Sequence, residues 1–154
     1  MNAVFWNILM AIRVQLQALP GVNSISIRQK EVLLESDNVV PGASQVVIYP
    51  NGTETRKNYL FGGRVIWTYP VAVIQAFPGN RVVTGPLANY LLTRQTLRNT
   101  LLTVSPILGG SVPSVFDLEV TPLDVVDLKA YTVGNYDVTG CDVTYDSEEY
   151  ITVG

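Results

Sequence analysis

The sequence contains no histidine and a single cysteine, Cys141, in 154 residues. Without histidine there is no Ser-His-Asp or Cys-His nucleophile pair, no imidazole to act as an acid or base near neutral pH, and no histidine-ligated metal. One cysteine can form neither a disulfide within the chain nor a cysteine-based zinc site. The search for chemistry therefore turns to carboxylates, and we expect no cofactor and no bound metal.

Charge is also scarce, because Asp, Glu, Lys and Arg make up 15% of the residues while 47% are hydrophobic. Soluble domains typically have about 25% charged residues. So little charge covers the surface of a lone monomer poorly, whereas the centre of a subunit interface is depleted of charge. We predict a homo-oligomer, with a monomer covered by Ser, Thr, Asn and Gln as the alternative. The net charge of -3 argues against a general nucleic-acid binder, which carries a basic footprint.

Long apolar runs are missing as well. No stretch reaches the roughly 18 apolar residues of a membrane-spanning helix. The apolar N-terminus lacks a basic leader, and Arg13 and Gln15 interrupt it at helical spacing, so we assign it to the mature fold and not to a signal peptide. We expect a single domain over residues 1–154 and a cytoplasmic origin.

Two segments have the periodicity of helices. Residues 2–19 carry apolar side chains three and four apart, with Asn2 as a candidate N-cap and Pro20-Gly21 as the end. In residues 86–104 proline suits the first helical position, and Arg94 and Arg98 share one face. These arginines form either a solvated basic edge or a contact to an acidic patch on a neighbouring subunit. The stripe of the first helix comprises Phe5, Ile8, Leu9, Ile12, Leu16 and Leu19.

Strands are predicted at residues 24–28, 31–34, 45–49, 64–77, 115–121 and 136–145. Asn51-Gly52 is a strong turn signal, which makes residues 53–57 the return arm of an exposed hairpin. Residues 71–74 are apolar on both faces, so we expect a central strand covered by helices on one side and by a neighbouring subunit on the other. Pro70 marks a bend, a bulge or an edge within that strand.

Four further expectations concern the second half of the chain. Residues 105–114 read as a flexible loop with two prolines and two glycines. The alternation of residues 115–121 places Phe116, Leu118 and Val120 inward. A slip in the alternation at Gly140 predicts a β-bulge. The acidic residues after Tyr145 read as a tail that frays or adds a strand to a neighbour.

Carboxylates that could form a catalytic or metal-binding cluster occur at Asp124 and Asp127, and at Asp142, Asp146, Glu148 and Glu149. The second group lacks the EF-hand pattern and its glycine, so a solvated edge or tail is the preferred interpretation. A different possibility is a ligand or peptide pocket lined by aromatic side chains, namely Trp67, Tyr69, Phe77 and Tyr90. We assign no catalytic, cofactor-binding or metal-binding residue.

The order of these elements resembles that of the tail terminator proteins of long-tailed bacteriophages and of the related head–tail neck proteins. An amphipathic helix and a hairpin precede the strand W-T-Y-P-V-A-V-I at residues 67–74. The helix with R-Q-T-L-R at residues 94–98 follows, and then the strands F-D-L-E-V-T-P at 116–122 and C-D-V-T-Y-D-S-E-E at 141–149. The resemblance covers nearly the whole chain and rests on layout.

What the resemblance implies is an α+β fold, a mostly antiparallel sheet with two α-helices packed on it and an extended β-hairpin, similar to the tail-tube fold. It further implies a non-catalytic subunit of a hexameric ring in the virion, which caps the tail tube and joins it to the head. The partners would be the tail tube protein, the head–tail connector or stopper protein, and genomic DNA passing through the lumen without sequence recognition. The sheath is a further candidate partner, and no membrane is involved.

In such rings the hairpin and loops make the contacts, which by position are residues 50–63 and 105–114 here. Together with the arginine pair, the interface candidates are Tyr49, Asn51, Arg56, Tyr59, Phe61, Arg94, Arg98, Ile107 and Leu108. Three alternatives stay open: another head–tail neck or stopper protein, a tail tube subunit, and a ligand- or peptide-binding module.

Overall fold

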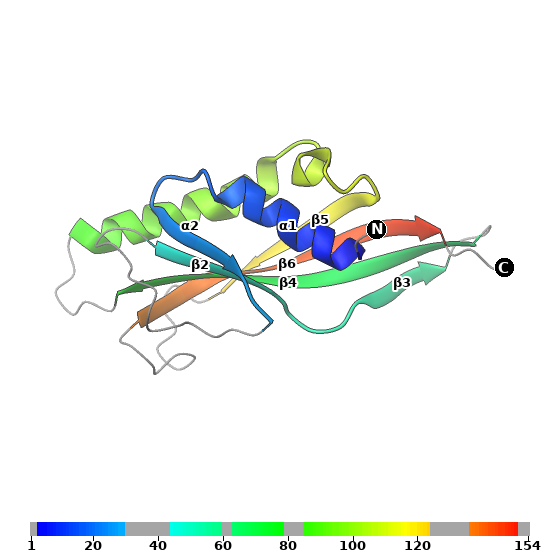
Figure 1. The fold of residues 1–154 in the computed structure, drawn as a ribbon, viewed down its shortest axis with the longest axis horizontal. Coiled ribbons are helices and arrows are strands. Elements are labelled where there is room, and N and C mark those ends of the chain that lie inside the picture. Colours follow the sequence, from blue (N-terminus) through cyan, green and yellow to red (C-terminus); the bar gives the residue numbers. More distant parts are fainter. Residues whose placement is uncertain (1–2, 30–43, 60–62, 79–84, 124–135, 151–154) are drawn as a thin grey trace.

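A computed structural model of the chain describes residues 3–29, 44–59, 63–78, 85–123 and 136–150. Six strands form one sheet, and two α-helices pack on the same face of it (Figure 1). Among the described strands only β1 and β2 pair in parallel, so this is the predicted α+β fold with a mostly antiparallel sheet. In chain order the elements are α1 (Val4–Leu16), β1 (Val22–Ile27), β2 (Ser44–Pro50), β3 (Thr55–Tyr59), β4 (Arg64–Pro78), α2 (Gly85–Thr103), the 3-10 helix η2 (Ile107–Gly110), β5 (Val115–Pro122) and β6 (Tyr136–Tyr150).

The 15-residue strand β4 is the centre of the sheet, whose order is β1-β2-β4-β6-β5. One edge of β4 pairs with β6 along its whole length, and the other edge pairs first with β3 and then with β2. Pro70 lies at the gap between these two partners. Its carbonyl accepts a hydrogen bond from the Asn51 N–H at 3.0 Å, so its missing N–H faces the same interrupted edge. This agrees with the prediction of a local edge at the proline.

The predicted hairpin between β2 and the following strand is wrong. Both edges of β2 are occupied, by β1 and by β4, and no edge is left for β3. The Asn51-Gly52 segment therefore carries the chain onward along β4 instead of turning it back. The extended hairpin consists of β3 and β4, and with the end of β6 it reaches beyond the helices (Figure 1).

Residues 71–76 of β4 are buried on both faces of the sheet. Val71 and Val73 belong to the large core under the helices, and Ala72, Ile74 and Ala76 belong to a smaller core on the opposite face, as the alternation predicts. The smaller core is completed by Val47, Tyr49 and Val138. These side chains are buried within the single chain. The expectation that a neighbouring subunit covers this part of the second face is therefore wrong.

Buried polar groups tie α2 to the sheet. The Gln75 amide Nε2 in β4 donates to Ser44 Oγ at 2.8 Å and to the Tyr90 carbonyl of α2 at 3.0 Å. One turn further along the helix, the Arg94 guanidinium donates to Thr139 Oγ1 and to the Leu123 carbonyl, both at 2.9 Å. Because buried polar groups need partners, these bonds fix where α2 lies over β4 and β6.

The first helix packs through its predicted stripe, in which Ile8, Leu9, Ile12 and Leu16 are buried. At its start the Phe5 ring meets the Tyr69 ring edge-on, with the centroids 5.1 Å apart. The N-cap position is Ala3, which makes no side-chain capping bond. Asn2, the predicted cap, lies outside the described residues, as do the strand expected at 31–34 and the carboxylates Asp124 and Asp127.

The segment 105–114, predicted to be a flexible loop, contains η2 and inserts Leu108 into the large core. Leu108 is 3% exposed and has a φ of 55°, in the left-handed region. That conformation costs a non-glycine residue about 1–2 kcal/mol, and burying a leucine contributes about 1.5–3 kcal/mol. Packing therefore outweighs the backbone cost and orders the segment.

Two details of β5 and β6 differ from prediction. Phe116 is exposed because the register of β5 shifts between Val115 and Asp117, which turns its side chain out of the core. No bulge occurs at Gly140, which pairs with Ile74 in unbroken register. The apparent slip arises because β6 is apolar on both faces. The strand also continues to Tyr150, so the acidic segment is part of the sheet and not a tail.

Replacing Gly140 with alanine should strongly destabilise the fold. Gly140 has a φ of 149°, and a Cβ there would lie 2.2 Å from the Val73 carbonyl oxygen of the neighbouring strand. Backbone strain and the clash together should lower the free energy of unfolding by roughly 3 kcal/mol or more, measured by urea denaturation. Gly52→Ala is the matched control, because Gly52 also has a positive φ but only the Pro70 ring edge, 3.9 Å away, beside it. Equal losses in the two variants would contradict the close approach.

The stability of the protein should fall as the pH rises above 9. Burial, with a contribution from the Asp142 carboxylate, raises the pKa of the Cys141 thiol from 9.0 to about 12. Between these values the unfolded chain loses the thiol proton while the folded chain keeps it, so alkali favours unfolding. Cys141→Ala should reduce the slope of unfolding free energy against pH, between pH 9.5 and 11, by about 1.4 kcal/mol per pH unit. An unchanged slope would show that the thiol titrates normally in the fold.

Candidate functional site

Large apolar side chains lie exposed on the sides of α1 and α2 that face away from the core. Trp6 is 45% exposed and Val14 58%, and on α2 Leu92 is 62% exposed. Neither helix contains an aspartate or a glutamate, and their charged residues are three arginines. We call this the outer helix surface, and its members are Trp6, Val14, Leu91, Leu92 and Leu102.

The composition of α1 explains why it has two apolar sides. Its inner stripe fills the core, and Trp6, Met10 and Val14 recur four residues apart on the outer side. A helix that is apolar nearly all round is usually buried on all sides. In the single chain α1 is buried on one side only, so its outer side offers apolar area to a partner. The four-residue spacing of Trp6, Met10 and Val14 is visible in the sequence, but the predicted stripe covered only the inner side of the helix.

The opposite face of the sheet is acidic wherever it is not part of the smaller core. The register places five carboxylates from β5 and β6 on this side, because directly paired residues point to one face. We call it the acidic sheet face, and it consists of Asp117, Glu119, Asp142, Asp146 and Glu148. The molecule is thus divided into a helix side with arginines and a sheet side with acids.

Asp146 is the anchor of the acidic sheet face. It is 7% exposed, and its two carboxylate oxygens accept hydrogen bonds from Lys57 Nζ and Thr68 Oγ1, both at 2.7 Å. The hydrogen bond and the charge of Asp146 raise the pKa of Lys57. The ion pair closes one side of a shallow hollow of about 220 Å³, which is lined by Thr55, Lys57, Thr68, Asp117, Leu118, Glu119, Thr144 and Asp146.

Of the group predicted at Asp142, Asp146, Glu148 and Glu149, the three carboxylates other than Asp146 each have a partner of their own. Asp142 accepts a bond from Asn51 Nδ2 at 3.0 Å, and burial raises its pKa. Glu148 pairs with the Arg64 guanidinium at 3.1 Å. Glu149 lies on the helix side and accepts a bond from the Tyr69 hydroxyl. The four carboxylates of this stretch are therefore divided between two faces, and no three acids or cysteines among the described residues are placed to hold a metal ion.

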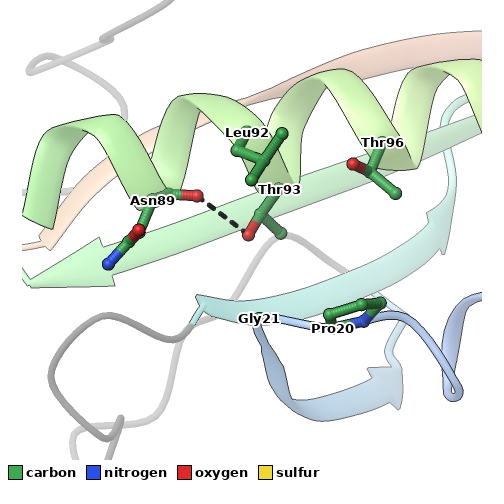
Figure 2. A pocket seen from close by; sticks show the side chains of 6 residues that line it. All are labelled: Pro20, Gly21, Asn89, Leu92, Thr93 and Thr96. Carbon is green, nitrogen blue, oxygen red and sulfur yellow. Dashed lines mark hydrogen bonds between the residues drawn. The ribbon is translucent and has the colours of Figure 1, made fainter.

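A second hollow, of about 300 Å³, lies between α2 and the turn that follows α1 (Figure 2). Its walls are Pro20, Gly21, Asn89, Leu92, Thr93 and Thr96, and the Thr93 hydroxyl donates to the Asn89 carbonyl at 3.0 Å. Trp67, Tyr69 and Tyr90, three of the aromatic residues expected to form a ligand pocket, do not line it. Tyr69 and Tyr90 are buried, Trp67 packs against the core, and the side chain of Phe77 lies outside the described residues. The uncharged lining has few features that could orient a ligand.

The structure distributes the predicted interface residues between core and surface. Tyr49 and Leu108 are buried, Ile107 packs against the core, and Arg94 is tied to β6 and Leu123, so these four serve the fold of the single chain. Asn51 and Arg56 are exposed. Arg98 is half-exposed, and its Nε donates to Oδ1 of its neighbour Asn99 at 3.4 Å. The side chains of Tyr59 and Phe61 lie outside the described residues.

Comparison of the sequence with models of protein families and with curated proteins gives no match. None of the helices in the described ranges combines the length and the apolar character needed to cross a membrane.

Removing the Thr68 hydroxyl should destabilise the protein through Asp146. Thr68→Val leaves a buried carboxylate oxygen without its donor, so the free energy of unfolding should fall by about 1–2 kcal/mol. Thr55→Val is the control, since Thr55 is exposed and lies directly opposite Thr68 on the same face; it should change stability by less than about 0.5 kcal/mol. Urea denaturation at pH 7 measures both, and a harmless Thr68→Val would remove Asp146 as the anchor.

Proposed function

We propose that this protein is a structural subunit of a ring in the tail or neck of a long-tailed bacteriophage. Within that class we favour a tail terminator, a hexameric ring that caps the tail tube and joins it to the head connector, with the virion as its location. The tail tube protein and the connector or stopper protein are the partners. The family enters through the resemblance of the layout, and the α+β fold is of the kind that this resemblance implies.

The observation that carries the assembly role is the outer helix surface. Exposed apolar side chains on one face of a soluble domain mark a contact with another molecule. Here they come from two helices that contain no acidic residue, and charge depletion is the compositional mark of an interface centre. Five of the 13 acidic residues of the chain lie on the acidic sheet face instead.

The acidic sheet face supports a second part of the proposal, the passage of DNA without binding. On this face five carboxylates outnumber Lys57 and Arg64, the two cations that pair with Asp146 and Glu148, so its net charge repels phosphates. A channel that runs past this face would let a duplex slide. The extended hairpin of β3 and β4 supplies the reach for contacts above or below the ring. Of the predicted interface residues, Asn51 and Arg56 are exposed on or beside this hairpin.

The purified protein should assemble. Size-exclusion chromatography with light scattering, over a range of concentrations and with added tail tubes, should give a mass near six subunits or a ring formed only on the tubes. Leu91→Gln combined with Leu92→Gln should weaken this assembly and leave the melting temperature nearly unchanged, because both side chains are exposed.

Leu97→Ala is the control for folding, since Leu97 is 2% exposed and its truncation should cost about 2–5 kcal/mol of stability. A monomer that is indifferent to concentration and to tail tubes would overturn the proposed function. Assembly that survives the paired glutamines would remove α2 from the interface.

A further inference from the structure

The exposed apolar side chains on α1 lie beside a positive charge. Arg13 is exposed and adjoins Val14, and Trp6 lies two turns earlier on the same side of the helix. The first 28 residues of the chain contain no acidic residue. This side of α1 therefore combines apolar area with a basic charge, and no described carboxylate of the same segment neutralises it.

The strand β5 presents the complementary combination. The register shift between Val115 and Asp117 leaves Phe116 50% exposed, next to the exposed carboxylates Asp117 and Glu119. Among the described strands β5 pairs only with β6, and it is the last strand in the sheet order. An aromatic ring and two acids thus project from one edge of the sheet.

These two surfaces belong to opposite faces of the sheet. α1 packs with β1, β2 and η2 on the helix side, whereas the register places Asp117 and Glu119 of β5 on the acidic sheet face. A contact between two α1 helices would bring two Arg13 side chains together, and a contact between two β5 strands would bring four carboxylates together. Like charges at an interface cost energy, so symmetric pairing of either surface is disfavoured.

We propose that copies of this chain associate head to tail, with Trp6, Arg13 and Val14 of α1 in one copy against Phe116, Asp117 and Glu119 of β5 in the next. Such a contact buries Trp6 and Val14 against Phe116 and pairs Arg13 with the two acids. A heterologous contact of this kind repeats from copy to copy and closes into a ring when the rotation allows it. This inference rests on the proposed function in one respect only, namely that the repeating contact closes into a ring.

Two variants, each with one of the two surfaces disabled, test the head-to-tail contact directly. Trp6→Ser with Arg13→Glu keeps the β5 surface, and Phe116→Ser with Asp117→Asn and Glu119→Gln keeps the α1 surface. Each variant alone should be monomeric by sedimentation velocity. An equimolar mixture should form a dimer and stop there, since each dimer presents only the two disabled surfaces. Arg13→Glu alone should weaken the association of the unmodified chain by at least about tenfold.

Glu54→Gln is the charge control, because it neutralises an exposed acid on the segment before β3, outside both surfaces, and it should associate as the unmodified chain does. A mixture that stays monomeric, or a variant that still assembles alone, would overturn the head-to-tail contact. A ring that forms regardless of both surfaces would overturn this inference and leave the proposed function standing. If the mixture dimerises but the unmodified chain forms open chains, the head-to-tail contact stands and the proposed ring is overturned.

Discussion

The burial of β4 on both faces and both edges is the constraint from which the rest of the structure follows. At 15 residues β4 and β6 each span roughly 50 Å, whereas the 13 residues of α1 span about 20 Å and the 19 of α2 about 28 Å. The helices therefore cover only part of the sheet. What extends beyond them, β3 with the ends of β4 and β6, is a ribbon with one polar face, and Asp146 anchors that face through Lys57 and Thr68.

The same layering separates the charges. The helices supply arginines and no acids, and the acids of β5 and β6 that point away from the helices collect on the other side of the sheet. Since strand residues alternate between faces, Asp142, Asp146 and Glu148, spaced by even numbers, fall together, and Glu149 falls with Tyr69 on the helix side. The acidic residues from Asp142 to Glu149 resemble a metal-binding motif in the sequence. In the fold they are separated, and each carboxylate has its own hydrogen-bond or ion-pair partner.

Much of the fold could be predicted from periodicity, because the α1 stripe, the two-faced β4 and the proline at its interrupted edge are local patterns. What could not be predicted depends on which strands pair. Asn51-Gly52 favours a hairpin locally, but both edges of β2 are already occupied. Gly140 suggests a bulge only if β6 has a single apolar face. Tyr49 and Leu108 were assigned to an interface because an apolar residue in or beside a loop cannot be distinguished from a core residue without the packing that buries it.

Apart from Tyr150 at the end of β6, the large exposed apolar residues occur on the two helices and at one bulge, and this position limits what they can do. An exposed apolar edge strand invites open-ended sheet extension, whereas a helix satisfies its own backbone bonds and offers only side chains. Trp6 and Val14 can thus bind a partner without templating a sheet. The register shift at Phe116 disturbs the regular ladder at the β5 edge, and Asp117 and Glu119 add charges there that discourage pairing with another acidic edge. A contact between α1 and this edge combines the apolar side chains of the helix with the exposed ring of Phe116. In that contact Arg13 of the helix faces the acids of β5, whereas two copies of the β5 edge would repel each other.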